Sequence, residues 1–357
     1  MKKIMYTINF LTNGGPTRVL ENIVSNLDMA EYDVYILTII DENDEILVNK
    51  YQEKGVKIIS FGYSKNIKEV LKHKNKILNT IYDVDPDVIH THGIVTTFLV
   101  ASYKKNVKRI TTIHNNIFED YKLTYGTLKG LAYAFLHIAI LRKFDEIICC
   151  SKTAKDALRK FLNKSIYIRN GIDIQFKSSK TRNEIRKELG IPDDSIVFVY
   201  GGVINKRKRV CELVEMINTC INNNEYWLVI GDGSLLDKAI SLSNNCNIKF
   251  LGFKNNIIDY FRAADIYVSN SSSEGFSISV LEALECNLLL LLSDIPSHKE
   301  CFEVDDTFYI GEYFNASNFR DKKNHVVKML KNDIKTSEFK EKYFSSNIMA
   351  KEYIKYY

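Results

Sequence analysis

Two patterns of apolar and polar positions alternate along this chain. Short, mainly apolar runs such as Tyr32–Ile40 predict β-strands. Segments such as Thr17–Leu27, in which apolar residues recur every three or four positions, predict amphipathic helices. Strands that alternate with helices in this way are typical of doubly wound α/β domains, so we predict an α/β fold built from parallel sheets.

One pattern, a predicted strand followed by a glycine-containing loop, begins at two places in the chain. A predicted strand at Lys3–Asn9 and another at Ile196–Tyr200 are each followed by a loop that contains two neighbouring glycines. At 357 residues the chain is long enough for two domains with separate cores. We therefore expect a first domain at residues 1–175, a second at 176–340 and a C-terminal helical segment at 341–357.

Two further helices carry information about the surface. Residues 65–81 read as one helix with a stripe of lysines at Lys65, Lys68, Lys72 and Lys76, which is either a solvated face or a contact with a membrane surface. Leu131–Leu141 is apolar and is interpreted as a core helix rather than a membrane anchor.

Charge is spread unevenly along the chain. Residues 1–175 hold 25 Lys and Arg against 19 Asp and Glu, whereas residues 176–357 hold 24 against 25. The basic half could face nucleic acid or an anionic membrane, but no nucleic-acid-binding motif accompanies it.

Other features narrow the class of protein. No run approaches 18 apolar residues, so no membrane-spanning helix is predicted, and the first residues read as a strand rather than a signal peptide. The seven cysteines form no C-x-x-C pair, which favours reduced thiols in a cytosolic protein over disulfides or a zinc site.

Glycines and histidines follow predicted strands of the first domain. Gly14 and Gly15 come after the first strand, His90 and His92 lie at the end of a later one, and His114 follows Arg109–Ile113. Because ligands of doubly wound domains bind at the carboxyl ends of strands, these residues suggest a cleft.

A basic loop follows the first strand of the second domain. Gly202 is followed shortly by four consecutive cations, Lys206, Arg207, Lys208 and Arg209. Such a loop suits a diphosphate, although an ordinary basic surface loop is the alternative.

Two glutamates bracket a predicted helix N-terminus in the second domain. Ser277 is a plausible N-cap, and the N–H groups near Ser277, Ile278 and Ser279 would face an anion. Glu274 and Glu282 lie on either side, and since carboxylates repel phosphate we expect them to bind hydroxyl groups. Two surface glutamates around an ordinary capped helix are the alternative.

Together these motifs resemble the GT4-type, retaining glycosyltransferases (glycosyl transferases group 1) of the GT-B fold. The E-x7-E motif is Glu274–Glu282, Lys208 matches the family's lysine, and Asn170–Asp173 matches the "NGID" segment before the interdomain linker. The resemblance covers roughly residues 4–357. Val203 stands where the family has Arg, and Asn115 where many members have Asp.

The resemblance implies two Rossmann-like domains that face each other across a cleft, with the acceptor in the first and a nucleotide-sugar in the second. It implies retaining transfer from a UDP-sugar to a saccharide, expected to be lipid-linked, in bacterial surface polysaccharide biosynthesis. The last helix could cross back to the first domain. The implied catalytic residues are Lys208, Glu274 and His114. The implied donor-binding residues are Gly14, Gly15, Gly202, Lys206, Arg207, Arg209, Phe253, Gly275, Phe276, Ser277, Ile278, Ser279 and Glu282.

Neither a metal nor another cofactor is expected, because no Asp-x-Asp motif stands at a strand end and the cations would replace a metal. We expect a cytoplasmic protein, with the inner face of the cytoplasmic membrane as a peripheral site. Two alternatives stay open. One is a nucleotide-sugar epimerase of GT-B shape that uses His90, His92 and His114, and the other is a non-catalytic nucleotide-sugar-binding subunit.

Overall fold

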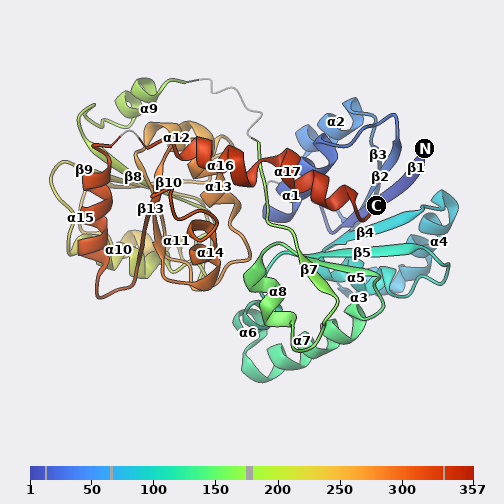
Figure 1. Ribbon diagram of the computed structural model, residues 1–357. Coiled ribbons are helices and arrows are strands. Elements are labelled where there is room, and N and C mark those ends of the chain that lie inside the picture. Colours follow the sequence, from blue (N-terminus) through green and yellow to red (C-terminus); the bar gives the residue numbers. More distant parts are fainter. Residues whose placement is uncertain (13, 65–66, 174–179, 333) are drawn as a thin grey trace. The chain divides into compact units, whose positions relative to one another are not determined.

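The computed structural model describes residues 1–12, 14–64, 67–173, 180–332 and 334–357. The chain forms two compact units (Figure 1). The first consists of Met1–Gly171 with Ser346–Tyr357, and the second of Ile172–Ser345. The chain therefore leaves the first unit at residue 171 and returns to it at residue 346.

The first unit is a parallel sheet of seven strands in the order β3-β2-β1-β4-β5-β6-β7, with helices between consecutive strands. Its strands are β1 (Lys2–Ile8), β2 (Tyr32–Ile40), β3 (Lys57–Tyr63), β4 (Val88–His92), β5 (Lys108–Ile113), β6 (Glu146–Cys149) and β7 (Ser165–Tyr167). Its helices are α1 (Gly15–Ser25), α2 (Glu45–Glu53), α3 (Ile67–Lys72), α4 (Lys74–Val84), α5 (Ile94–Val100), α6 (Ile117–Tyr125), α7 (Thr127–Leu141), α8 (Lys152–Leu158) and α17 (Ser346–Ile354).

The second unit repeats this plan with six parallel strands in the order β10-β9-β8-β11-β12-β13. Its strands are β8 (Ile196–Gly201), β9 (Glu225–Ile230), β10 (Ile248–Gly252), β11 (Ile266–Ser269), β12 (Leu289–Ser293) and β13 (Gly311–Phe314). Its helices are α9 (Arg182–Glu188), α10 (Val210–Asn218), α11 (Leu236–Leu242), α12 (Ile257–Ala263), α13 (Ile278–Glu285), α14 (Pro296–Phe302), α15 (Phe319–Met329) and α16 (Thr336–Phe344).

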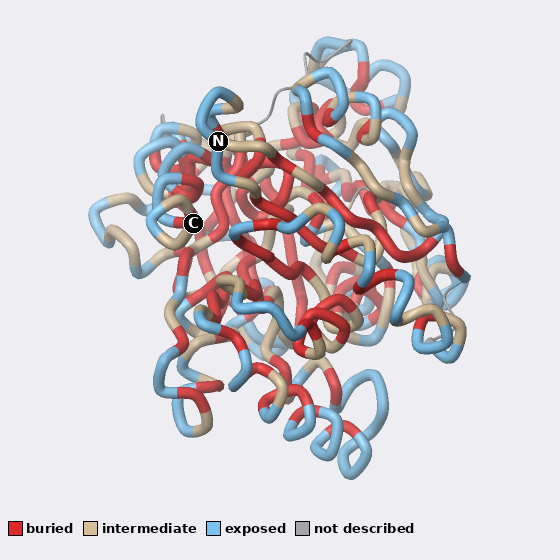
Figure 2. Tube along the Cα trace, turned by 90° about the vertical axis from the view of Figure 1, so that its right-hand side faces the viewer, coloured by how far each residue is buried: buried red, intermediate tan, exposed pale blue. Residues whose placement is uncertain are grey.

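The apolar pattern explains both units. The central strands are buried almost throughout (Figure 2), and helices such as α1 bury the apolar stripe that the sequence predicts, with Val19, Leu20, Ile23 and Val24 facing the core. The predicted fold class, two doubly wound Rossmann-like domains, is confirmed.

The last helix belongs to the first unit. In α17, Ser346 Oγ accepts a hydrogen bond of 2.8 Å from Asn26 Nδ2 beside α1, and Tyr353 is fully buried. The hydroxyl of Tyr357 lies 3.0 Å from Nδ1 of His90, itself a buried residue of β4. Residues near the C-terminus thus complete the core that the N-terminal strands begin.

The helix predicted at residues 65–81 is wrong in one respect, because the chain forms α3 and α4 with a break at His73. The His73 ring stacks on Tyr63 at 4.7 Å between centroids, and its backbone (φ −98°, ψ 10°) leaves the helical region. Lys65 lies outside the described residues. Lys68 and Lys72 belong to α3 and Lys76 to α4, so these lysines do not form a stripe along one helix.

The interpretation of Leu131–Leu141 as a core helix is correct for one face only, where Ala134, Ile138 and Leu141 belong to the core. Helix α7 buries one side, while Leu128, Tyr133, Phe135 and Leu136 are between 47% and 84% exposed. Amphipathic periodicity identifies a core face, but a helix that is apolar all round gives no such signal. None of the helices in the described part of the chain is long and apolar enough to cross a membrane.

Candidate functional site

Each sheet has one place where the strand order reverses. In the first unit the reversal falls between β1 and β4, and in the second between β8 and β11. Loops leave such neighbouring strands toward opposite faces of the sheet, so an opening forms at the carboxyl edge. The residues with candidate chemistry gather at both of these points.

In the second unit, the loops after β8 and β11 are joined by hydrogen bonds. The carbonyl of Arg207 accepts from the backbone N–H of Ser272 at 2.8 Å, and the carbonyl of Arg209 accepts from Asn270 Nδ2 at 3.0 Å. These bonds hold the basic loop against the loop that carries Glu274.

Glycine allows a third loop to approach. Gly231, after β9, has φ of +138°, and a Cβ there would lie 1.9 Å from the carbonyl oxygen of Gly202. The N–H of Ile204 donates to the carbonyl of Asp232 at 2.8 Å. Any other residue at 231 would force the two loops apart, so this glycine fixes the position of the basic loop.

Glu274 is the centre of this site. Its side chain is buried, and Oε1 accepts from Lys208 Nζ and from Ser271 Oγ, each at 2.6 Å. Oε2 accepts from Arg207 Nη1 at 2.8 Å. Burial alone would raise the pKa of Glu274, but Lys208 and Arg207 hold that pKa at about 2. The cluster of one carboxylate and two cations keeps a net positive charge.

The four predicted cations separate in the structure. Lys208 and Arg207 contact Glu274, whereas Lys206 is exposed. Arg209 sits before α10 with φ of 51°, its Nε 3.9 Å from Glu212. Four adjacent cations in a sequence give no sign of which will converge, since that depends on the turn between β8 and α10.

Position 203, where the family has an arginine, is occupied by a valine. Val203 is 56% exposed. The second cation beside Lys208 comes instead from Arg207, whose guanidinium also donates to the carbonyl of Ser273 at 2.9 Å.

Residues behind Glu274 were missed by sequence reasoning. Ser271 donates to the carboxylate, and its own carbonyl accepts from Ser293 Oγ at 2.6 Å. The ring of His298 lies 3.0 Å from the Ser293 carbonyl, and burial lowers its pKa to about 4. Ser271, three residues before Glu274, could have been noticed, but nothing in the sequence connects His298 to this site.

Helix α13 begins as predicted, with Ser277 at the N-cap position. The Ser277 side chain makes no capping hydrogen bond. Ser277, Ile278 and Ser279 are all partly exposed, so the first turn is accessible. Glu282 lies further along the same helix and is also partly exposed.

Three other predicted residues of this unit have different surroundings. Gly275 and Phe276 are buried, and the Phe276 ring packs against Phe344 at 5.1 Å between centroids. Phe276 therefore anchors the loop to α16. Phe253, directly after β10, is 62% exposed and offers an aromatic face to solvent.

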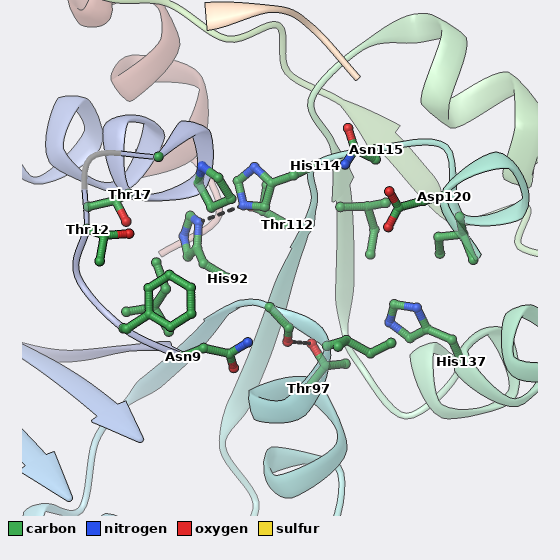
Figure 3. A pocket seen from close by; sticks show the side chains of 18 of the residues that line it. Asn9, Thr12, Thr17, His92, Thr97, Thr112, His114, Asn115, Asp120 and His137 are labelled. Atoms are coloured by element: carbon green, nitrogen blue, oxygen red, sulfur yellow. Dashed lines mark hydrogen bonds between the residues drawn. The ribbon is translucent and has the colours of Figure 1, made fainter. Parts of the chain in front are cut away.

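The first unit has a pocket of about 290 Å³ at its own switch point (Figure 3). The ends of β1, β4 and β5 form one side, and α6 and α7 form another. Gly14, the N-cap residue of α1, and Asn115 both line the pocket, and Gly15 begins α1 beside it. Polar side chains that face it include Asn9, Thr17, His92, His114, Asp120 and His137.

The histidines of this unit have two different roles. His92 Nδ1 and His114 Nε2 lie 3.2 Å apart in the pocket, and burial lowers the pKa of His114 to about 4 and that of His92 well below its usual value. Both rings are therefore neutral at pH 7. His90, by contrast, belongs to the core, where Nε2 lies 2.8 Å from Thr112 Oγ1.

His137 of α7 was not predicted. It is buried at the pocket with Nδ1 at 3.0 Å from the Tyr121 hydroxyl, and its Nε2 has no hydrogen-bond partner among the residues that the structure describes. A single histidine in an apolar helix carries no signal of such a position before the packing of α6 and α7 is known.

Comparisons with known proteins agree with this geometry. Residues 13–176 match the family described as Glycosyltransferase Family 4, and residues 181–343 match Glycosyl transferases group 1. The structure superposes on HepE of Anabaena, solved with UDP and glucose, with a TM-score of 0.80, 15% identity and 99% of each chain covered. The fold is therefore GT-B.

Relatives with named activities are also glycosyltransferases. The chain is 29% identical to the O-antigen biosynthesis glycosyltransferase WclY of Escherichia coli, over 84% of this chain and 82% of that one. It is 23% identical, over 98% of both chains, to the N,N'-diacetylbacillosaminyl-diphospho-undecaprenol alpha-1,3-N-acetylgalactosaminyltransferase of Campylobacter jejuni. The chain belongs to the glycosyl transferases group 1, with family 4 in its N-terminal half, and is a glycosyltransferase.

The epimerase alternative finds no support in the site. In the described part of the chain, the hydrogen bonds of the His90, His92 and His114 rings are with hydroxyls and with one another, and none is with a carboxylate; Nε2 of His92 has no partner. Acid–base chemistry by these rings would need a charged partner to bring their pKa values toward neutrality.

The Glu274 cluster predicts a pH-dependent stability. The carboxyl has a lower pKa in the folded state, about 2, than its usual 4.5, so its stabilising contribution is complete above pH 4.5 and is lost as the pH falls toward 2. The difference in free energy of unfolding between the wild type and Glu274→Gln should therefore shrink from pH 6 to pH 2.5. Urea unfolding at each pH measures it. Glu215→Gln, an exposed carboxylate of the same unit, is the control, and an equally steep difference there would contradict the assignment.

Proposed function

We propose that this chain transfers a hexose from a UDP-sugar to a lipid-linked saccharide, with retention of anomeric configuration, at the cytoplasmic face of a membrane. The observation that carries the proposal is the buried cluster of Glu274 with Lys208 and Arg207 at the switch point of the second sheet. The names of the relatives, one of them acting on a diphospho-undecaprenol-linked sugar, and the UDP bound to HepE support the choice of substrates.

The cluster suits a departing diphosphate. Breaking the bond between the anomeric carbon and the phosphate leaves negative charge on the phosphate oxygen. Lys208 and Arg207 are already held in place by Glu274, so they could stabilise that charge with little reorganisation. The N-terminus of α13 near Ser277 would add its partial positive charge.

The two glutamates take separate roles in the proposal. Glu282, on the partly exposed side of α13, would accept hydrogen bonds from the ribose hydroxyls. Glu274 would hold Lys208 and Arg207 in place. When the diphosphate binds Lys208, one oxygen of the Glu274 carboxylate would become free to accept hydrogen bonds from the sugar hydroxyls. Phe253 would lie against the base, while Gly202 and the amides of Ile278 and Ser279 would face the phosphates.

The acceptor belongs, in this proposal, in the pocket of the first unit. A hydroxyl of the acceptor forms the new bond to the anomeric carbon and gives its proton to the departing phosphate oxygen, so no protein base is required. The neutral pair of His92 and His114, with Gly14 and Gly15 at the start of α1, would bind uncharged hydroxyl groups. The His114 backbone would face the donor sugar.

No metal takes part in the proposed reaction. Lys208, Arg207 and the helix N-terminus supply the positive charge that a divalent ion supplies in other transferases. In the described part of the chain, no group of three or more acidic, histidine or cysteine side chains is arranged to hold an ion.

Transfer itself is the first test. A panel of UDP-sugars is incubated with a prenyl-diphosphate-linked saccharide, with and without EDTA, and products are identified by mass spectrometry. We expect one donor to give a lengthened saccharide with retained configuration at equal rates in both conditions. Activity that EDTA abolishes and manganese restores would refute the metal-free mechanism, and binding of UDP without any transfer would favour a non-catalytic subunit.

Lys208→Ala should lower turnover by about a hundredfold or more, the scale expected for loss of one preorganised charge contact. Lys206→Ala is the matched control, because Lys206 is adjacent in sequence but exposed. Its turnover should remain within a few-fold of the wild type. Equal losses in both variants would mean that the loop contributes only a general positive field.

Glu282→Ala should weaken binding of UDP alone, because hydrogen bonds to a charged group contribute about 1.5–3 kcal/mol each. Glu274→Ala should impair transfer more than UDP binding. Titration calorimetry with UDP and steady-state kinetics separate the two effects. If both variants bind UDP as tightly as the wild type, the assignment of Glu282 to the ribose is wrong.

A further inference from the structure

The outer side of α7 is apolar and has no partner within the described structure. Leu128 is 84% exposed, and Leu131, Tyr133, Phe135 and Leu136 are each between 41% and 49% exposed. Neighbouring α6 adds Leu123 and Tyr125, at 46% and 50%. We call α6 and α7 together the α6–α7 hairpin (Figure 1). Contiguous apolar surface of this kind marks a site of interaction.

The two helices of the hairpin pack closely against each other. A Cβ at Gly130 of α7 would lie 2.6 Å from the carbonyl oxygen of Tyr121, which shows how closely the two helices pack. The rings of Tyr125 and Tyr133 meet edge to face at 4.9 Å between centroids. Phe135 packs against Phe118 of α6 and Phe161 after α8 while keeping half of its surface exposed.

The hairpin carries two carboxylates, Glu119 and Asp120 in the first turn of α6, and only cations beyond them. Residues 121–143 contain four cations and no Asp or Glu. Lys122 and Lys129 are exposed on the hairpin, and Arg142 and Lys143 are exposed directly after it. An apolar helix face bordered by cations and tyrosines is typical of helices that lie in the headgroup region of an anionic bilayer.

The hairpin also forms part of the pocket. Asp120 and Tyr121 of α6 and His137 of α7 line it from the buried side of the same helices (Figure 3). A bilayer on the outer side would therefore lie one helix diameter, about 10 Å, from the pocket. That distance suits a ligand with a saccharide head and a lipid tail.

We propose that the α6–α7 hairpin docks the protein onto the surface of an anionic phospholipid bilayer, with Leu128 and Leu136 in the headgroup region. The proposal rests on the proposed function, since a lipid-linked acceptor would be presented to the pocket from that bilayer. Helix α7 has 15 residues and is about 22 Å long, so it lies in the interface and does not span the membrane.

Vesicle flotation tests the docking. The full chain is mixed with vesicles of phosphatidylglycerol and phosphatidylcholine, or of phosphatidylcholine alone, at low salt. The wild type should float with the anionic vesicles, and Leu128→Gln/Leu136→Gln should lower its partition at least tenfold. Lys122→Gln/Lys129→Gln should lower it roughly fivefold for each lysine, an effect that high salt removes.

Matched controls use exposed residues elsewhere. Ile46→Gln/Ile240→Gln removes two apolar side chains of α2 and α11, 78% and 45% exposed, and Lys68→Gln/Lys72→Gln removes two lysines of α3. Both should float like the wild type. Failure of the wild type to float, or equal losses in the control variants, overturns the proposal.

Two further measurements distinguish docking to lipid from self-association and from the transfer reaction. Light scattering without lipid shows whether the surface binds a second copy, and a dimer that Leu128→Gln/Leu136→Gln dissolves would overturn docking to lipid. Transfer to a water-soluble, short-chain acceptor tests the proposed function alone. A variant that keeps this transfer but no longer floats supports docking. A wild type that floats without any transfer refutes the proposed function and leaves the docking of the hairpin standing.

Discussion

A buried carboxylate has to be matched by positive charge, and in the second unit this requirement organises the site. Glu274 is buried, and an unpaired carboxylate there would be strongly unfavourable. Lys208 and Arg207 meet it from the loop after β8, and Ser271 meets it from its own loop. The glycine at position 231, which lets the loop after β9 approach, serves the same contact. The arrangement of the site in the second unit thus follows from the two ion pairs of Glu274, at the point where the strand order reverses.

The sites of the two units differ in the charge of their polar side chains. The second concentrates fixed charge, whereas the pocket of the first holds histidines kept neutral by burial, although its half of the chain is the more basic. A positive site suits a diphosphate, and uncharged histidine rings suit hydroxyl groups. The excess of cations in the first half lies on the outside instead, where residues 121–143 carry four of them without a carboxylate.

The sequence predicted the fold class and the start of α13 because both depend on a local pattern, the spacing of apolar residues. It did not predict the break at His73, which depends on a ring stacked across to Tyr63. It placed His90 in a cleft, whereas the residue is buried beside Tyr357, more than 260 positions away in the chain. It also could not select Arg207 from four adjacent cations. Each of these depends on contacts between distant segments, which a local pattern does not contain.

The return of α17 to the first unit affects the order in which the protein matures. The core around His90 and Thr112 includes Tyr353, so it stays incomplete until that segment has been made. Ribosomes add about 5–20 residues per second, so the 174 residues of the second unit, 172–345, delay this by roughly 10–35 s. Until then, α1 lacks helix α17, which packs against it in the complete structure. The core of the first unit is therefore completed only after the whole of the second unit has been synthesised.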